Sequence, residues 1–201
     1  MEDFVHPSLP GRLSWRNRPR EWRLDESGRL SIAAPAKTDL FYDPAGSARI
    51  DNSPCALFAP PDPAFLLSAL VSVEFASTFD AGVLLLRGSD EAWAKLCFEF
   101  SPQREAMAVS VVTRGISDDC NSAVIENGTV HLRIAYTPIT TSFHYSLDGS
   151  LWHLVRYFTL GRLKAPQVGF SSQSPTGGGC KAVFSEIRYR AGVLRDIRGG
   201  E

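Results

Sequence analysis

TSFHYSLDGSLWHLVRYF, residues 141–158, is the stretch of sequence that decides the fold class. Two runs in which apolar and polar residues alternate flank Asp148-Gly149, a dipeptide that supplies the positive φ values of a tight hairpin turn. Alternation with a period of two is typical of a half-buried β-strand. We therefore predict an antiparallel hairpin made of the strands Thr141–Leu147 and Leu151–Phe158.

The same pattern recurs along most of the chain. Alternating or short apolar runs are broken by Gly, Pro, Asn and Asp, and helix signals are nearly absent. A chain of this kind buries its apolar faces sheet against sheet, which predicts an all-β sandwich or jelly roll and excludes a parallel α/β fold. Further strands are predicted at Arg29–Ala33, Ala69–Phe75, Ala81–Arg87, Ala92–Phe100, Met107–Thr113, Thr129–Tyr136, Gln167–Ser172 and Ala182–Tyr189.

Length and composition favour one globular domain. All-β sandwiches often contain about 200 to 250 residues, and this chain has 201. Apolar residues make up 44% and charged residues 21%, so a disordered or fibrous chain is not expected. We predict a single domain over residues 1–201, with an N-terminal segment (1–25) packed on the sandwich and a loose tail at 192–201.

The charge balance gives no general attraction to nucleic acid or to a membrane surface. Lys and Arg number 21, Asp and Glu 22, and the net charge is -1. The segment Arg12–Arg23 does mix arginines with Trp15 and Trp22, a combination that can stack on single-stranded nucleic acid. We favour the interpretation that the tryptophans anchor this segment to the sandwich while the arginines face water.

No apolar run reaches the ~18 residues of a membrane span, and the start of the chain lacks the layout of a signal peptide. The four cysteines show no CxxC pair or close histidine spacing, so neither a zinc site nor a disulfide framework is indicated. We expect a cytoplasmic protein with no metal and no cofactor.

Seven fragments lie in this order along the chain: SWRNRPREWRLDESGRLSI, KTDLF, FDAGVLLLRGSDEAWAKLCFEF, VSVVTRGISDD, LRIAYTPITTSFHYSLDGSLWHLVRYF, VGFSSQSPTGGG and VFSEIRY. Taken together, they resemble the regulation-of-enolase-protein-like family, whose domain has no known function. The resemblance implies a concanavalin A-like jelly roll of two antiparallel sheets, with a ligand groove on the curved sheet, and no established reaction. Where the family has a TDFW segment, this chain has Leu40 and Phe41.

The predicted strand AWAKLCFEF is the first candidate site. Trp93, Lys95 and Glu99 alternate onto one face, opposite the apolar face that we expect to join the core. Trp93 could stack on a sugar while Lys95 and Glu99 bond hydroxyl groups. The alternative is an ion pair on a solvated sheet.

The second candidate site is VVTRGISDDCNS, which we expect to be a strand end followed by a loop. Arg114, Asp118 and Asp119 lie there, and loops at the rim of a sandwich commonly contact ligands. The oxygen atoms of this loop could also hold calcium, but ordinary turn chemistry is the interpretation we favour.

Signals for catalysis are weak. Glu99 could serve a glycoside hydrolase only with a second carboxylate, which the sequence does not identify. No serine lies in a GxSxG elbow. We expect His144 and His153 to face each other across the predicted hairpin as a cross-strand pair, and not to form a metal site.

Three functions follow from these patterns. The first is a non-catalytic binding module for a carbohydrate or polyhydroxylated metabolite. The second is a regulatory protein that acts on a metabolic enzyme through a protein contact. A glycoside hydrolase is the third, and neither nucleic acid nor a membrane is expected as a partner.

Overall fold

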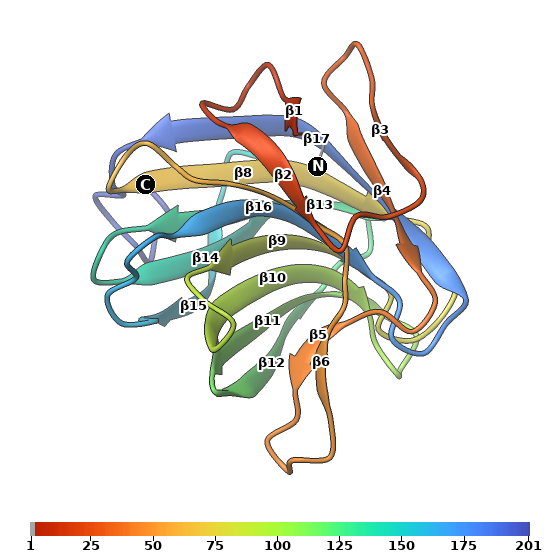
Figure 1. Ribbon diagram of the computed structural model, residues 1–201. Helices are drawn as coiled ribbons and strands as arrows, with labels where there is room; N and C mark the ends of the chain where they lie inside the picture. The colour runs from red at the N-terminus through yellow and green to blue at the C-terminus, as the bar shows by residue number, and fades with distance from the viewer. Residues whose placement is uncertain (1–2) are drawn as a thin grey trace.

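The computed structural model describes residues 3–201 and shows a sandwich of two large antiparallel sheets with no helix in that range (Figure 1). The first sheet has eight strands in the order β1-β2-β7-β16-β9-β10-β11-β12. These strands are β1 (Phe4–Val5), β2 (Arg12–Arg16), β7 (Cys55–Phe58), β9 (Ala81–Arg87), β10 (Ala92–Phe100), β11 (Ala106–Arg114), β12 (Ile116–Val124) and β16 (Gln167–Gln173).

The second sheet has seven strands in the order β15-β14-β13-β8-β17-β4-β3. These strands are β3 (Trp22–Leu24), β4 (Leu30–Pro35), β8 (Phe65–Val73), β13 (Thr129–Tyr136), β14 (Thr141–Ser146), β15 (His153–Phe158) and β17 (Gly179–Ala191). A separate two-stranded ribbon, β5 (Leu40–Tyr42) and β6 (Arg49–Asp51), projects from the sandwich in Figure 1. The predicted all-β sandwich is therefore confirmed.

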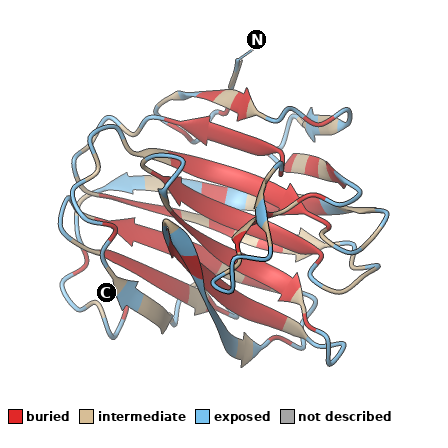
Figure 2. Ribbon diagram, turned by 60° about the horizontal axis from the view of Figure 1, so that its bottom comes forward, coloured by how far each residue is buried: buried red, intermediate tan, exposed pale blue. Residues whose placement is uncertain are grey.

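The main core fills the space between the two large sheets. Leu84 on β9, Leu96 and Phe98 on β10, and Ile134 on β13 are all fully buried in it. Figure 2 shows buried residues along the strands of both sheets and exposed residues mainly in the connections. No helix in residues 3–201 has the length and apolar character needed to cross a bilayer.

Sequence alternation located the long strands well. The predicted boundaries of β9, β10 and β13 agree with the structure, and the predicted hairpin is present because β14 pairs antiparallel with β15. Its turn is wider than predicted, since Gly149 alone in residues 147–152 has a positive φ, of 74°. The sequence did not indicate β1, β2, β3, β5, β6, β7 or β12.

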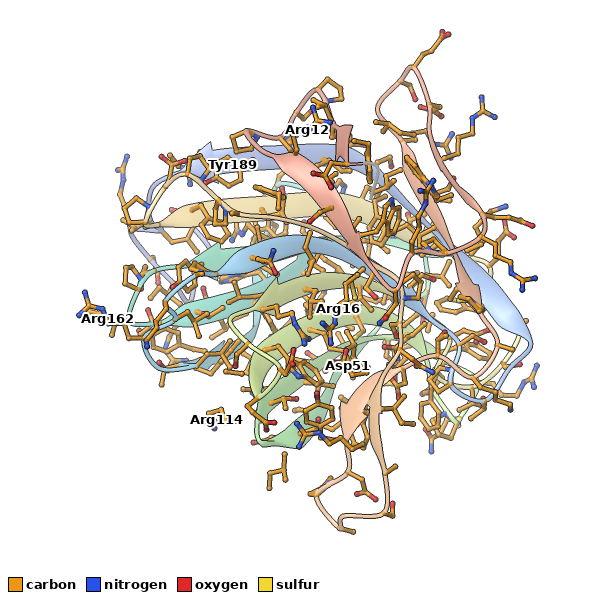
Figure 3. The ribbon with its side chains drawn as sticks, in the orientation of Figure 1. Arg12, Arg16, Asp51, Arg114, Arg162 and Tyr189 are labelled. Atoms are coloured by element: carbon orange, nitrogen blue, oxygen red, sulfur yellow. The ribbon has the colours of Figure 1, made fainter. Side chains whose placement is uncertain are left out.

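The outer face of the eight-stranded sheet is also covered. Leu40 and Tyr42 of β5 lie with Val83, Leu85 and Trp93 in a second apolar cluster on that face. The base of the ribbon is fixed by ion pairs, because Asp51 Oδ2 lies 2.5 Å from Arg16 and 3.2 Å from Arg87. Arg16 and Asp51 lie close together in Figure 3.

The residues at both ends of the described chain pack on the sandwich. In the N-terminal segment Phe4, Trp15 and Trp22 contact one another, with Trp15 and Trp22 ring centroids 5.3 Å apart. Residues 1–2 of the predicted segment lie outside the described residues. The predicted loose tail is wrong: Leu194 and Ile197 pack in a small apolar cluster, and the Gly200 carbonyl accepts a hydrogen bond from Arg133 at 2.8 Å.

Candidate functional site

A cavity of about 120 Å³ lies on the outer face of the eight-stranded sheet, beside the segment that leads into β5. That volume holds several water molecules or the head of a small organic molecule, and not a chain of sugars. We call it the Lys95 cavity. Its lining consists of four ionisable side chains, two phenylalanine rings, a glutamine and a valine: Lys95, Asp39, Glu99, Asp119, Phe41, Phe79, Gln173 and Val111.

The sheet register brings the polar side chains together. Lys95 on β10 and Asp119 on β12 pair with the same residue of β11. Glu99 on β10 and Gln173 on β16 likewise pair with the same residue of β9. Because residues four apart in a strand share a face, Lys95 and Glu99 project to the same side of the sheet.

Lys95 is the cation of the cavity. Its side chain is only 2% exposed, and Nζ donates hydrogen bonds to Asp39 Oδ1 at 3.0 Å and to Gln173 Oε1 at 2.8 Å. Burial lowers the pKa of Lys95, but the nearby Asp39, Cys97 and Glu99 together more than offset this effect and the pKa is raised. An ammonium group has three protons, so one remains for another acceptor.

Asp39 reaches the cavity from an anchored loop. The backbone amides of Thr38 and Ser174 each donate to the other residue's carbonyl, at 3.3 and 3.1 Å. The amide of Asp39 donates to Asn52 Oδ1 at 2.8 Å. These bonds hold the Asp39 carboxylate in position before any ligand binds.

Phe79 forms one wall of the cavity from the loop between β8 and β9. Its φ is +69°, a costly conformation for a residue with a large side chain, and the residue is 37% exposed. The neighbouring Asp80 is fully buried and its carboxylate accepts hydrogen bonds from the amides of Ala76 and Ser77, at 2.9 and 2.8 Å. Strain that the surroundings enforce in this way is common in segments that contact ligands.

The Glu99 carboxyl group is buried without a close cation. The residue is 8% exposed, and its side chain's one hydrogen bond within the described residues is a long one from Gln173 Nε2, at 3.5 Å. Burial raises the pKa of Glu99 to about 8, although Lys95 lowers it in part. Burial therefore has a larger effect on this carboxyl group than the charge of Lys95, whose ammonium group is bonded to Asp39 and Gln173.

This raised pKa predicts how stability depends on pH. A carboxyl group whose pKa is higher in the folded state stabilises the fold below its unfolded pKa, about 4.5, and that contribution is lost as pH rises through about 8. The Glu99→Gln substitution removes this loss of stability at high pH. We therefore expect the variant to be more stable than wild type at pH 8.5 and similar to it at pH 4.5. The gain should be a few kcal/mol, at about 1.4 kcal/mol for each pKa unit.

Urea unfolding at the two pH values measures this difference. Glu105→Gln, at an exposed position past the end of β10, is the matched control and should change stability equally at both. A Glu99→Gln variant that is less stable than wild type at pH 8.5 would contradict the raised pKa.

Of the six predicted site residues, three line the Lys95 cavity: Lys95, Glu99 and Asp119. Trp93 does not, since it is 0% exposed and packs edge-on against Tyr42 with ring centroids 5.5 Å apart. The polar face of β10 is thus covered by the β5 segment rather than open to solvent, and neither a stacking platform at Trp93 nor a solvated ion pair is present.

Arg114 and Asp118 lie away from the cavity. Arg114 is exposed at the sheet edge, where it donates to the Thr159 carbonyl at 3.3 Å (Figure 3). Asp118 forms an ion pair with Arg156 at 2.9 Å. The loop predicted here is strand β12, which pairs with β11 along its length, so the turn interpretation is wrong. Among residues 3–201 no group of acidic, histidine or cysteine side chains is arranged to hold a metal ion.

We expected the two hairpin histidines to face each other, and the structure shows that they do not. His153 pairs with Tyr145 and stacks on its ring at 4.9 Å, whereas His144 pairs with Leu154 and is buried. The ring of His144 lies 2.8 Å from the Ile197 carbonyl, and burial lowers its pKa to about 4. Neither histidine belongs to the cavity lining.

A glycoside hydrolase would need a second carboxyl group across a scissile bond from Glu99. Lys95 lies in the same cavity as Glu99 and is bonded to Asp39 and Gln173. Its charge lowers the pKa of Glu99 and of Asp119 relative to the effect of burial alone. The arrangement offers fixed hydrogen-bonding groups around a small space.

Sequence reasoning missed five lining residues: Asp39, Phe41, Phe79, Val111 and Gln173. The KTDLF fragment did contain Asp39 and Phe41, and the family's aromatic residue in that segment was a usable signal. Phe79 lies in a Ser-Thr-Phe-Asp turn between two strands, so burial in a strand does not explain why an apolar residue is found there. Gln173 gave no signal, because only the register with β9 places it beside Glu99.

The fold and this cavity define a concanavalin A-like sandwich with a small polar site on one sheet. The chain belongs to the family described as "Protein of unknown function (DUF1349)", whose profile matches residues 15–191. It is 27% identical over 176 residues to "Regulation of enolase protein 1" of Saccharomyces cerevisiae, a match that covers 86% of each chain. The family resemblance seen in the sequence is thereby confirmed.

Solved structures support the same fold. A functionally unknown protein from Saccharomyces cerevisiae has a TM-score of 0.81 and 25% identity, over 90% of this chain and 97% of that one. The GH43 protein BlXynB from Bacillus licheniformis has a TM-score of 0.72 and 18% identity, over 95% of this chain but 38% of that one. A legume lectin-like domain from Entamoeba histolytica has a TM-score of 0.59 and 11% identity, over 90% of both chains.

Proposed function

We propose that this protein is a non-catalytic binding module whose Lys95 cavity takes a small polyhydroxylated ligand, such as a monosaccharide or a polyol. The observation that carries the proposal is a buried ammonium group with a free proton, next to a buried carboxyl group and two aromatic rings. Ligands with apolar faces and several hydroxyl groups are recognised by this combination of rings and few directional polar groups.

Binding fits the cavity better than catalysis does. Lys95, Asp39 and Gln173 are bonded to one another in a fixed arrangement, which suits the recognition of hydroxyl groups. A glycosidase needs one carboxyl group on each side of a scissile bond, and a volume of about 120 Å³ leaves little room for a sugar on both sides.

Calorimetric titration with neutral monosaccharides and sorbitol tests the binding function. We expect binding to the wild type and a loss of about tenfold in affinity for Phe79→Ala, because one aromatic wall is removed. Leu151→Ala, at a 63% exposed position in the hairpin turn, is the matched control and should bind like wild type. No heat with any compound at millimolar concentration would refute the proposal, as would unchanged binding by Phe79→Ala.

A second candidate function is regulation of a metabolic enzyme through a protein contact. The name of the yeast relative, which refers to enolase, favours this candidate. The exposed arginines of the N-terminal segment, Arg18, Arg20 and Arg23, provide a basic surface for an acidic partner. Purified enolase from the source organism should then co-elute with this protein in gel filtration at low salt, and separate elution would count against the candidate.

We also propose that the protein acts in the cytoplasm and that residues 1–201 form one domain. All four cysteines are free thiols, which is the usual state in a reducing compartment.

A further inference from the structure

The Lys95 cavity contains more carboxyl groups than cationic groups. Lys95 is its one cation, and it is already paired with Asp39 at 3.0 Å. Within residues 3–201, no Lys, Arg or His nitrogen lies within 4.0 Å of a carboxyl oxygen of Glu99 or Asp119. Two carboxyl groups therefore line the cavity without a direct ion pair.

Resting on the binding function proposed above, we infer that the ligand carries a protonated amino group among its hydroxyls, as an amino polyol or amino sugar does, and that this ammonium lies between Glu99 and Asp119. A carboxylate as buried as that of Glu99 needs a counter-charge, and the ligand would supply it. The rings of Phe41 and Phe79 also attract a cation at close range. An organic cation is favoured over a metal ion because the described residues contain no metal-holding cluster.

The same charges act against anionic metabolites. A phosphate or carboxylate that entered the cavity would meet the carboxyl groups of Asp39 and Asp119 and, as pH rises through about 8, the ionised Glu99, while the one ammonium group is shared with Asp39. Repulsion of this kind excludes compounds of similar shape but the wrong charge. The cavity therefore selects by charge among molecules with the same hydroxyl pattern.

Binding of an ammonium should release a proton from Glu99. The charged groups that act on its carboxyl are Lys95 on the same strand, Asp119 on β12 and Asp39 on the loop before β5. The charge of Arg156 acts in turn on Asp119. Burial raises the pKa of Glu99 to about 8, so the free protein holds this proton at neutral pH. A bound ammonium favours the ionised form, and affinity for it should rise as pH rises toward 8.

Three probes with the same six-carbon chain test the inference: 1-amino-1-deoxysorbitol, sorbitol and gluconate, which differ in one charged or neutral end group. Calorimetry at pH 6 and pH 8.5 compares them while the amine stays protonated, as a lysine does. We expect the amine to bind about tenfold more tightly than sorbitol at pH 8.5, and gluconate about tenfold less tightly. The ratio of amine to sorbitol affinity should be smaller at pH 6.

Two variants locate the amino group. Glu99→Gln should abolish the pH dependence of the amine preference, and Asp119→Asn should reduce the preference itself. Asp119 is exposed, so its variant carries the test if Glu99→Gln does not fold. Asp118→Asn is the matched control, because the neighbouring Asp118 is paired with Arg156 and does not line the cavity.

The outcomes separate the two proposals. Sorbitol binding without a preference for the amine, or with a preference for gluconate, overturns the inference and leaves the binding function intact. Failure of all three probes, together with the neutral monosaccharides, overturns the binding function itself. An amine preference that Asp118→Asn removes and Asp119→Asn does not would place the cation elsewhere and also overturn the inference.

Discussion

Trp93→Ala should lower the free energy of unfolding by about 3 to 5 kcal/mol, the usual cost of truncating a large buried aromatic residue. Trp93 is 0% exposed and belongs to the apolar cluster that joins β5 to the eight-stranded sheet. The cavity that remains would lie between Tyr42 and the sheet, so the ribbon would lose the edge-on contact of Tyr42 with this ring. Urea unfolding monitored by circular dichroism measures the change.

Trp93→Phe is the informative partner of this variant. The indole Nε1 has no hydrogen-bond partner among the described residues, so replacing it with a phenyl ring removes no bond and retains most of the packing. We expect a loss below about 1.5 kcal/mol and unchanged ligand binding. If Trp93→Ala kept wild-type stability but lost ligand binding, the residue would act as a stacking platform after all.

Trp93 also shows where sequence periodicity stops being informative. Alternation along Ala92–Phe100 placed the strand and its two faces correctly, because side chains of a strand point to opposite sides in turn. Alternation cannot say whether a second face meets solvent or another segment. Here the β5 segment covers that face, and its contact with β10 joins residues more than fifty positions apart.

The strands that the sequence missed are short or polar. β5 and β6 have three residues each, too few for a period to be seen, and β12 reads ISDDCNSAV, in which turn-forming residues predominate. β12 forms because it follows β11 through the tight turn at Gly115, whose φ is 80°. Local propensity was overridden by this pairing, and Asp119 enters the cavity as a result.

Only the part of the candidate site that lies along one strand could be predicted from the sequence as one site. Lys95 and Glu99 share one strand, so their spacing in the sequence was enough to place them together. Asp39 and Gln173 come from positions far along the chain and reach Lys95 through loop anchoring and strand order. The contacts of Asp39 and Gln173 with Lys95 depend on the order of the strands in the sheet. No local sequence pattern reveals that order.

Lys95→Met is the second substitution with a large expected effect, and pH should modulate it. Loss of the ammonium leaves Asp39 and Glu99 without a cation in a buried site, which typically costs about 3 to 5 kcal/mol. The pKa of Glu99 should rise further in the folded variant because Lys95 no longer lowers it, so the variant's stability is retained below pH 4.5 and is lost as pH increases. The deficit relative to wild type should be large at pH 8.5 and small at pH 4.5.

A double substitution makes this expectation specific to charge. Lys95→Met combined with Asp39→Asn removes the buried pair together, and the two changes should cost less than their sum at pH 8.5 because the partners interact directly at 3.0 Å. Urea unfolding of the two single variants and the double variant completes the cycle. Costs that add, or a Lys95→Met deficit that does not change between pH 4.5 and 8.5, would mean that Lys95 acts through packing alone and that the cavity does not depend on its charge.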